Sequence, residues 1–197
     1  LAKGNRSRLG EERVTADLLL NALAEACGVD DRLDLVLAED EGEALLSTRT
    51  HAPKEWQDLL AGRLPCVGCL EAAKMDPNSG PQAVFPGAFH PLHAGHRGIV
   101  QTAADILQCP VAYEISIVNV DKPPLDFAEI ESRLAQFASA DTVWLTSAPT
   151  FQEKARIFPG ATFLVGMDTL LRLFDPKYYG DDPDACDEAL AEIRARG

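Results

Sequence analysis

Three of the four histidines in this 197-residue chain lie close together, at His90, His93 and His96. Imidazoles this close together in the sequence can bind a metal ion, bind phosphate, or lie in a polar loop without a shared role. A metal triad would need all three side chains to converge on one ion. Pro91 disfavours a helical conformation at His90, so the three do not share one helix face. We therefore favour a phosphate site and expect no metal ligands among the protein side chains.

The residues around the histidines supply what a phosphate site needs. Gly87 follows an apolar segment typical of a strand, where the backbone must turn tightly and let a ligand approach. Gly95 stands where a helix begins, so free backbone N–H groups and the positive end of the helix dipole face the same space. His93 and His96 can direct both imidazoles from this helix entry at one phosphate chain. Such donors suit a reaction in which negative charge moves onto leaving pyrophosphate.

The run Gly-Ala-Phe-His-Pro-Leu-His-Ala-Gly-His over 87–96 resembles the Gly-x-Phe-x-Pro-x-His-x-Gly-His signature of the nucleotidyltransferase superfamily, and every fixed position is present. That superfamily includes nicotinamide and nicotinate mononucleotide adenylyltransferases. The resemblance implies transfer of the AMP part of ATP to a small phosphorylated acceptor, with nicotinamide mononucleotide favoured and Mg²⁺ arriving with ATP. It implies catalytic roles for His93 and His96, and nucleotide contacts from Gly87, Ala88, Phe89, His90 and Gly95.

Later segments resemble further parts of that superfamily. Gly166-Met167-Asp168 is similar to its Gly-x-Asp element, which implies that Gly166 and Asp168 hold the ATP ribose, although Asp168 could also cap the following helix. The segment 119–124 resembles a Pro-Pro loop beside the acceptor, where Lys122 could reach a phosphate or be only a surface lysine. The segment 131–137 resembles a helix with an inward arginine, Arg133, which could bind the acceptor phosphate or make a structural ion pair.

The stretch 85–180 resembles a cytidylyltransferase-like subgroup of the superfamily, and residues 1–27 resemble the end of a CinA-type domain. Ala88 replaces the Ser or Thr common in the family, and His90 replaces Asp or Asn. No late Ile-Ser-x-x-x-x-Arg motif follows Gly180, so either the sequence is an excerpt or its triphosphate site is incomplete. Two alternatives therefore stay open, a CTP-dependent cytidylyltransferase and a degenerate, non-catalytic nucleotide-binding module.

The elements that must position these residues follow from the hydrophobic pattern. Beyond residue 81, strands alternate with helices, which predicts right-handed crossovers and a Rossmann-like α/β fold, a parallel sheet with helices on both faces. Ligands of such sheets bind where the carboxyl ends of the strands meet. We expect strands over 82–85, 111–118, 143–146 and 161–165, and helices over 95–107, 126–139, from about 150, 168–173 and 185–195.

The front part of the chain is less regular. Its periodicity predicts a helix over 11–27 that ends at Gly28, a strand over 33–37, and short helices over 54–61 and 66–74. The turn cluster at 76–81 predicts a domain boundary. We expect a small α/β or mostly helical segment over 1–80 and a nucleotidyltransferase-like domain over 81–197.

The amino-acid composition limits the possible binding partners and the cellular compartment. The net charge of −13 argues against nucleic acid or an anionic membrane as the main partner. No apolar run approaches the roughly 20 residues that span a bilayer, and five scattered cysteines favour a reducing compartment. We expect a cytoplasmic protein, and a homo-oligomer stays open. Cys66 and Cys69 form a lone Cys-x-x-Cys, weak support for zinc or redox chemistry, and we expect them to be structural or incidental.

Overall fold

The structure, a computed structural model, describes residues 6–37, 43–47, 51–74, 80–119 and 123–196. The chain divides into two compact units, Leu1–His51 and Ala52–Gly197. This division falls earlier than the boundary at 80 that the turn cluster predicts. Lys122, a candidate phosphate ligand, lies outside the described residues.

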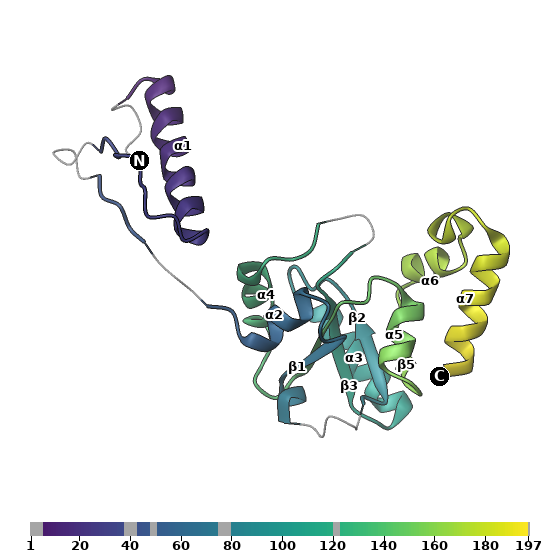
Figure 1. Cartoon of the computed structure of the whole chain (residues 1–197). Coiled ribbons are helices and arrows are strands. Elements are labelled where there is room, and N and C mark those ends of the chain that lie inside the picture. The colour runs from purple at the N-terminus through teal and green to yellow at the C-terminus, as the bar shows by residue number, and fades with distance from the viewer. Residues whose placement is uncertain (1–5, 38–42, 48–50, 75–79, 120–122, 197) are drawn as a thin grey trace. The chain divides into compact units, whose positions relative to one another are not determined.

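The front unit is built on helix α1 (Arg8–Ala26), drawn in purple in Figure 1. The Ser7 hydroxyl caps its start by accepting from the Gly10 N–H at 3.2 Å. Gly28 has a φ of 69°, the left-handed conformation that ends a helix, as predicted. The strand predicted over 33–37 is wrong, because side-chain bonds replace a strand ladder at Leu33: Asn21 accepts from its N–H at 2.7 Å and donates to its C=O at 2.8 Å.

The second unit is built on a five-stranded sheet in the order β1-β4-β3-β2-β5. β2 pairs in parallel with β3 and β5, β3 pairs in parallel with β4, and β1 joins the edge antiparallel to β4. The predicted Rossmann-like α/β fold is confirmed. The strands are β1 (Cys66–Leu70), β2 (Ala83–Pro86), β3 (Val111–Ser116), β4 (Thr142–Thr146) and β5 (Thr162–Phe163).

Strand β1 corrects the prediction of a helix over 66–74. Residues 66–70 form the edge strand, and only Glu71–Lys74 turn into a short 3₁₀ helix, η2. Periodicity alone cannot distinguish a strand from a helix in an apolar run this short. Val67 and Gly68 are poor helix formers, and the pairing with β4 decides the outcome. Because this strand completes the sheet, the unit begins well before residue 81.

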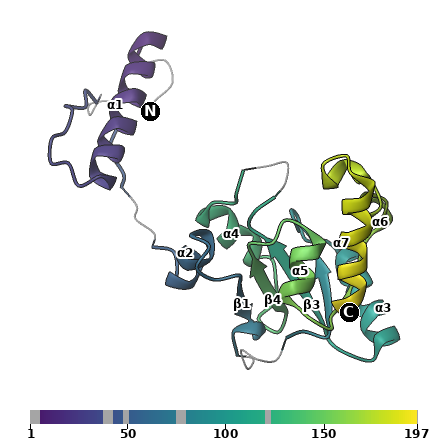
Figure 2. The same cartoon turned by 45° about the vertical axis from the view of Figure 1, so that its right-hand side comes forward.

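The helices connect and cover the strands (Figures 1 and 2). α3 and α4 form the crossovers from β2 to β3 and from β3 to β4, and α5 forms the return to β5. In Figure 2, α5 crosses in front of the sheet with α7 beside it. The ranges are α2 (Lys54–Leu60), α3 (Ala94–Leu107), α4 (Phe127–Leu134), α5 (Phe151–Ile157), α6 (Met167–Leu173), the 3₁₀ helix η3 (Pro176–Tyr179) and α7 (Pro183–Arg196).

Two separate cores lie on the two faces of the sheet, because successive strand residues point to opposite sides. On one face, Phe85 packs in a cluster that includes Ile130 of α4. On the other face, Val84 and Trp144 pack in a cluster with Phe158, which follows α5. The central strands are therefore mostly apolar on both faces, as a parallel sheet covered by helices requires, although Glu114 of β3 and Thr146 of β4 are buried polar residues.

Candidate functional site

The candidate site lies where the strand order reverses. The chain runs from β2 to β3 to β4 in one direction and then returns to β5 on the other side of β2. The loops that follow β2 and β5 therefore leave the sheet side by side at its carboxyl edge. In open α/β sheets, this switch point is where ligands bind. The loop after β2 carries the histidines, and the turn after β5 carries Gly166 and Asp168.

Gly87 and Phe89 form a close contact at the start of the histidine loop. A Cβ atom at Gly87 would lie 2.6 Å from Cζ of Phe89, so only glycine fits beneath this ring. Phe89 itself has a φ of 45° and is 1% exposed, with its ring packed edge-on against Tyr113 and Phe137. The sequence predicts a close approach of a ligand to Gly87, whereas the group observed there is an aromatic side chain of the same loop.

Residues at the end of α4 and just beyond it hold the loop in place. Arg133 donates to the Ala88 carbonyl at 2.9 Å and pairs with Glu129 one turn earlier on the helix. Gln136 donates to the Phe89 carbonyl at 3.0 Å and accepts from the Leu92 N–H at 2.8 Å. Arg133 thus makes the ion pair that the sequence left as an alternative. Its Nε is buried and has no hydrogen-bond partner among the described residues.

His93 and His96 form a pair at the start of α3. His93 is the N-cap, and its Nδ1 accepts from the Gly95 N–H at 3.1 Å. His96 closes the capping box, because its Nδ1 accepts from the His93 N–H at 3.3 Å. The two rings stack with centroids 3.7 Å apart. The Gly95 N–H, predicted to be free for an anion, is thus bonded to the imidazole of His93 in this structure.

This double cap fixes which imidazole nitrogens can donate. A ring nitrogen that accepts a hydrogen bond carries no proton, so each neutral ring carries its proton on Nε2. In both residues, Nε2 is therefore the nitrogen that can donate to a ligand. Burial, and to a lesser degree the neighbouring His93, holds the pKa of His96 below its usual value of 6.5. His96 is therefore a neutral donor at neutral pH.

A cavity of about 670 Å³ opens beside the loop. Of the residues predicted from the sequence, Gly87, Ala88, His90 and Arg133 line it. His93 and His96 are not in its lining, and the His96 ring packs against Phe85 and Phe89 instead. Residues from β3, α5 and α6 also line the cavity, chiefly Glu114, Ser116, Lys154, Thr169 and Arg172.

Gly166 and Asp168 stand at the start of α6, outside this lining. Gly166 is the N-cap of the helix, which begins at Met167, and no side chain caps it. The alternative that Asp168 caps the helix is therefore wrong. Asp168 is exposed in the first turn of α6, and the next residue, Thr169, is the first on this helix to line the cavity.

A buried ion pair lines the same cavity and was not expected from the sequence. Glu114 of β3 accepts from Lys154 of α5 at 2.7 Å and from the Thr146 hydroxyl at 2.5 Å. Glu114 is 0% and Lys154 5% exposed. One signal was available: a glutamate within the apolar strand Val-Ala-Tyr-Glu-Ile-Ser must find a partner once it is buried.

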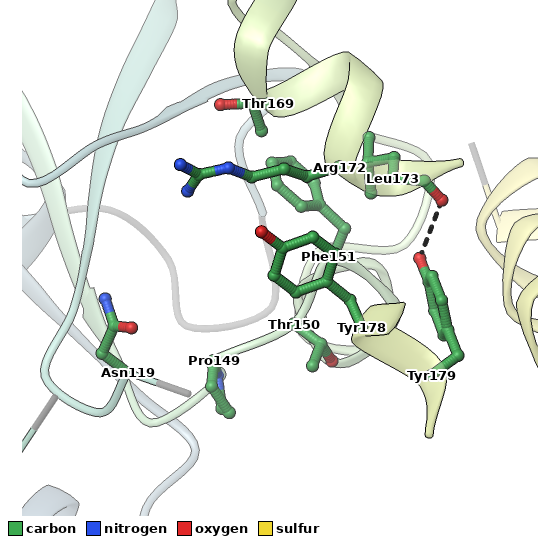
Figure 3. Close-up of a pocket in the computed structure, with 9 residues that line it drawn as sticks. All are labelled: Asn119, Pro149, Thr150, Phe151, Thr169, Arg172, Leu173, Tyr178 and Tyr179. Carbon is green, nitrogen blue, oxygen red and sulfur yellow. Dashed lines mark hydrogen bonds between the residues drawn. The ribbon is translucent and has the colours of Figure 1, made fainter. Parts of the chain in front are cut away.

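A smaller adjoining cavity of about 200 Å³ lies between α5, α6 and η3 (Figure 3). It shares five lining residues with the larger cavity: Asn119, Pro149, Phe151, Thr169 and Arg172. In Figure 3, the Arg172 guanidinium points into the open centre, and the Tyr179 hydroxyl donates to the Leu173 carbonyl at 3.1 Å. Within the part of the chain that the structure describes, the Arg172 side chain makes no hydrogen bond.

Cys66 and Cys69 do not form a joint site. They lie three residues apart on β1, so their side chains point to opposite faces of the sheet, Cys69 into one core and Cys66 against the other. Burial raises the pKa of Cys66, and it raises the pKa of Cys69 to about 11. Both thiols stay protonated at neutral pH, whereas metal binding and thiol exchange need the thiolate.

No family model, curated protein or solved structure matches this chain. Among the described residues, no group of three or more His, Cys, Asp or Glu side chains is arranged to hold a metal ion. No helix in the same residues is long and apolar enough to cross a membrane.

Proposed function

We propose that this chain is a nucleotidyltransferase that transfers the AMP part of ATP to a mononucleotide, with nicotinamide mononucleotide the favoured acceptor, and releases pyrophosphate. The observation that carries the proposal is the double cap of His93 and His96 at the switch point of the sheet. It leaves Nε2 of both rings as the nitrogen that can donate to a ligand, because both Nδ1 atoms already accept hydrogen bonds. Two such donors at a helix N-terminus suit a polyphosphate.

The proposed reaction needs no covalent intermediate on the protein. A phosphate oxygen of the acceptor attacks the α-phosphorus of ATP in line, and the bond from that phosphorus to the bridging oxygen breaks. Negative charge then gathers on the leaving pyrophosphate. Hydrogen bonds from His93 and His96 Nε2–H strengthen as this charge develops, which is where preorganised donors accelerate a reaction. Gly166 and Asp168, after β5, would hold the ATP ribose.

The cavity beside the loop has the size and charge for the acceptor. About 670 Å³ lies within the usual range for small-molecule sites. The Arg172 guanidinium offers a cation for the acceptor phosphate. Mg²⁺ would arrive with ATP and be held by its phosphate oxygens, supplying further charge compensation. Among the described residues the cysteines are free. Free cysteines and ATP as the donor suit a cytoplasmic enzyme, and we propose that compartment.

Two substitutions in the loop favour a second candidate. Ala88 lines the cavity without the hydroxyl that Ser or Thr would offer, and His90 lines it where Asp or Asn is usual. A non-catalytic module would bind nucleotide without releasing pyrophosphate. A cytidylyltransferase would use the same loop with CTP. Calorimetric titration with ATP, CTP and nicotinamide mononucleotide, followed by a pyrophosphate-release assay, separates the three.

The decisive experiment replaces the histidines one at a time. His93→Ala and His96→Ala should each lower kcat/KM for pyrophosphate release by about a hundredfold, the scale for losing a transition-state charge donor. His93→Asn should show the same loss although its helix cap is kept, because Asn is a strong N-cap but has no group at the Nε2 position. His51→Ala is the matched control, because His51 is exposed and lies in the front unit. Unchanged release in both alanine variants would refute the mechanism.

A further inference from the structure

The buried pair of Glu114 and Lys154 has one polar atom that the protein does not satisfy. Both hydrogen bonds to the Glu114 carboxylate, from Lys154 at 2.7 Å and from Thr146 at 2.5 Å, end on Oε1. Oε2 is buried and has no hydrogen-bond partner among the described residues. Since an unpaired buried acceptor is costly, and Glu114 lines the 670 Å³ cavity, a ligand in this cavity is the natural partner for Oε2.

Lys154, which lies beside Glu114, has hydrogen-bond donors to spare. An ammonium carries three hydrogens, and within the described residues the Lys154 ammonium donates only to Glu114 Oε1. Lys154 also lines the cavity. The pair therefore presents an acceptor, Oε2, and a donor, Nζ, next to each other. Because the two charges compensate one another, a neutral ligand group with one donor and one acceptor suits them better than an ion.

We infer that Glu114 and Lys154 recognise a carboxamide on the ring of the acceptor mononucleotide, which makes Glu114 the residue that selects amide over acid. The amide N–H donates to Glu114 Oε2, and the amide carbonyl accepts from Lys154 Nζ. A ring bearing a carboxylate instead would bring a second negative charge against Oε2 and offer it no hydrogen. This inference rests on the proposed function, and it specifies how that site chooses its acceptor.

The test compares two probes that differ only at this group, nicotinamide mononucleotide and nicotinate mononucleotide. On the unmodified chain, titration calorimetry should show about a hundredfold tighter binding of the amide, because two like charges placed together repel. Equal binding of the two probes, or tighter binding of the acid, would overturn the inference without any variant.

Two variants then assign the preference to this pair. Glu114→Gln should remove the preference for the amide or reverse it, because the Gln side chain can donate to a carboxylate and the Lys154 ammonium is left to attract one. That variant leaves Lys154 buried without a counter-charge and could unfold, so Glu114→Gln/Lys154→Gln serves as the charge-balanced form, with folding checked by circular dichroism. A folded double variant that keeps the hundredfold preference would overturn the inference.

Binding and release measurements on the unmodified chain distinguish a wrong role for Glu114 from a wrong proposed function. If ATP and both mononucleotides fail to bind the unmodified chain, the proposed function itself is wrong, and the inference falls with it. If ATP and both mononucleotides bind and pyrophosphate is released with either acceptor at equal efficiency, the proposed function stands and only the role of Glu114 is rejected.

Discussion

At the scale of single residues, His96 links the candidate site to the pH dependence of stability. Its pKa is lowered in the folded chain, chiefly by burial and next by His93, so the unfolded chain binds the proton more readily. The neutral form therefore stabilises the fold above the usual pKa of 6.5, and this contribution is lost as the pH falls below that value.

His96→Gln isolates this effect. Gln is a favoured residue at the third helical position of a capping box, so the variant keeps the cap but cannot titrate. Between pH 7.5 and 5.5, the Tm of the original chain should fall more steeply than the Tm of His96→Gln. Parallel pH profiles measured by circular dichroism would argue against the lowered pKa.

Lys154 gives a second prediction at this scale. Lys154→Met would leave the Glu114 carboxylate buried without its cation, and removal of one partner of a buried pair costs about 3–5 kcal/mol. Glu114→Gln/Lys154→Gln should cost much less, because no charge is left unpaired. Urea titrations of the two variants measure the difference, and equal losses would show that the pair is not coupled.

Some of these residues follow from local sequence signals, and others depend on contacts between distant parts of the chain. The helix predicted over 95–107 was enough to place His93 and His96 at its entry, because the signals of a helix N-terminus are local. Glu114 and Lys154 were not foreseen, because they are 40 residues apart and meet only once β3 and α5 pack. Arg172 was missed because nothing in the local sequence indicates which helical face lines a cavity.

At the scale of elements, α3 depends on a side chain that is also assigned a chemical role. The His93 cap holds the Gly95 N–H, and removal of a cap costs about 1 kcal/mol. His93→Ala should therefore lower the free energy of unfolding by about that amount, whereas His93→Ser and His93→Asn should restore it. Urea titration checks this, and equal stability of all the variants would show that the cap contributes nothing.

Prediction of whole elements succeeded where their signals were local. α4 starts where the sequence predicts it, at 126, because Asp126 is its N-cap and the Asp126 carboxylate accepts from the Glu129 N–H at 2.8 Å. α4 nevertheless ends at Leu134, before the predicted 139, and Gln136 in the turn that follows donates to the Phe89 carbonyl of the histidine loop. β1 could not be predicted, because its partner β4 lies more than 70 residues further along the chain.

At the scale of the whole molecule, the segment before the turn cluster belongs to the sheet. β1 covers the edge of β4, and Leu59 of α2 is buried in the same core as Val143 and Leu145. A chain of residues 81–197 would expose an unpaired strand edge and an open core face. We expect residues 52–197 to unfold in one cooperative transition, and residues 81–197 to aggregate or to unfold at a clearly lower urea concentration. Equal midpoints would support the boundary at 80.

The contact between Gly87 and Phe89 makes two positions of the loop interdependent. Any side chain at 87 would collide with the Phe89 ring, where the nearest approach to a Cβ is 2.6 Å. Gly87→Ala and Phe89→Leu should each destabilise the chain, while the double variant should cost less than the sum of the two, because the smaller residue makes room for the larger. A strictly additive double-mutant cycle would contradict this. In any lineage that carries this loop, we then expect a side chain at 87 only where a smaller residue has replaced the ring at 89.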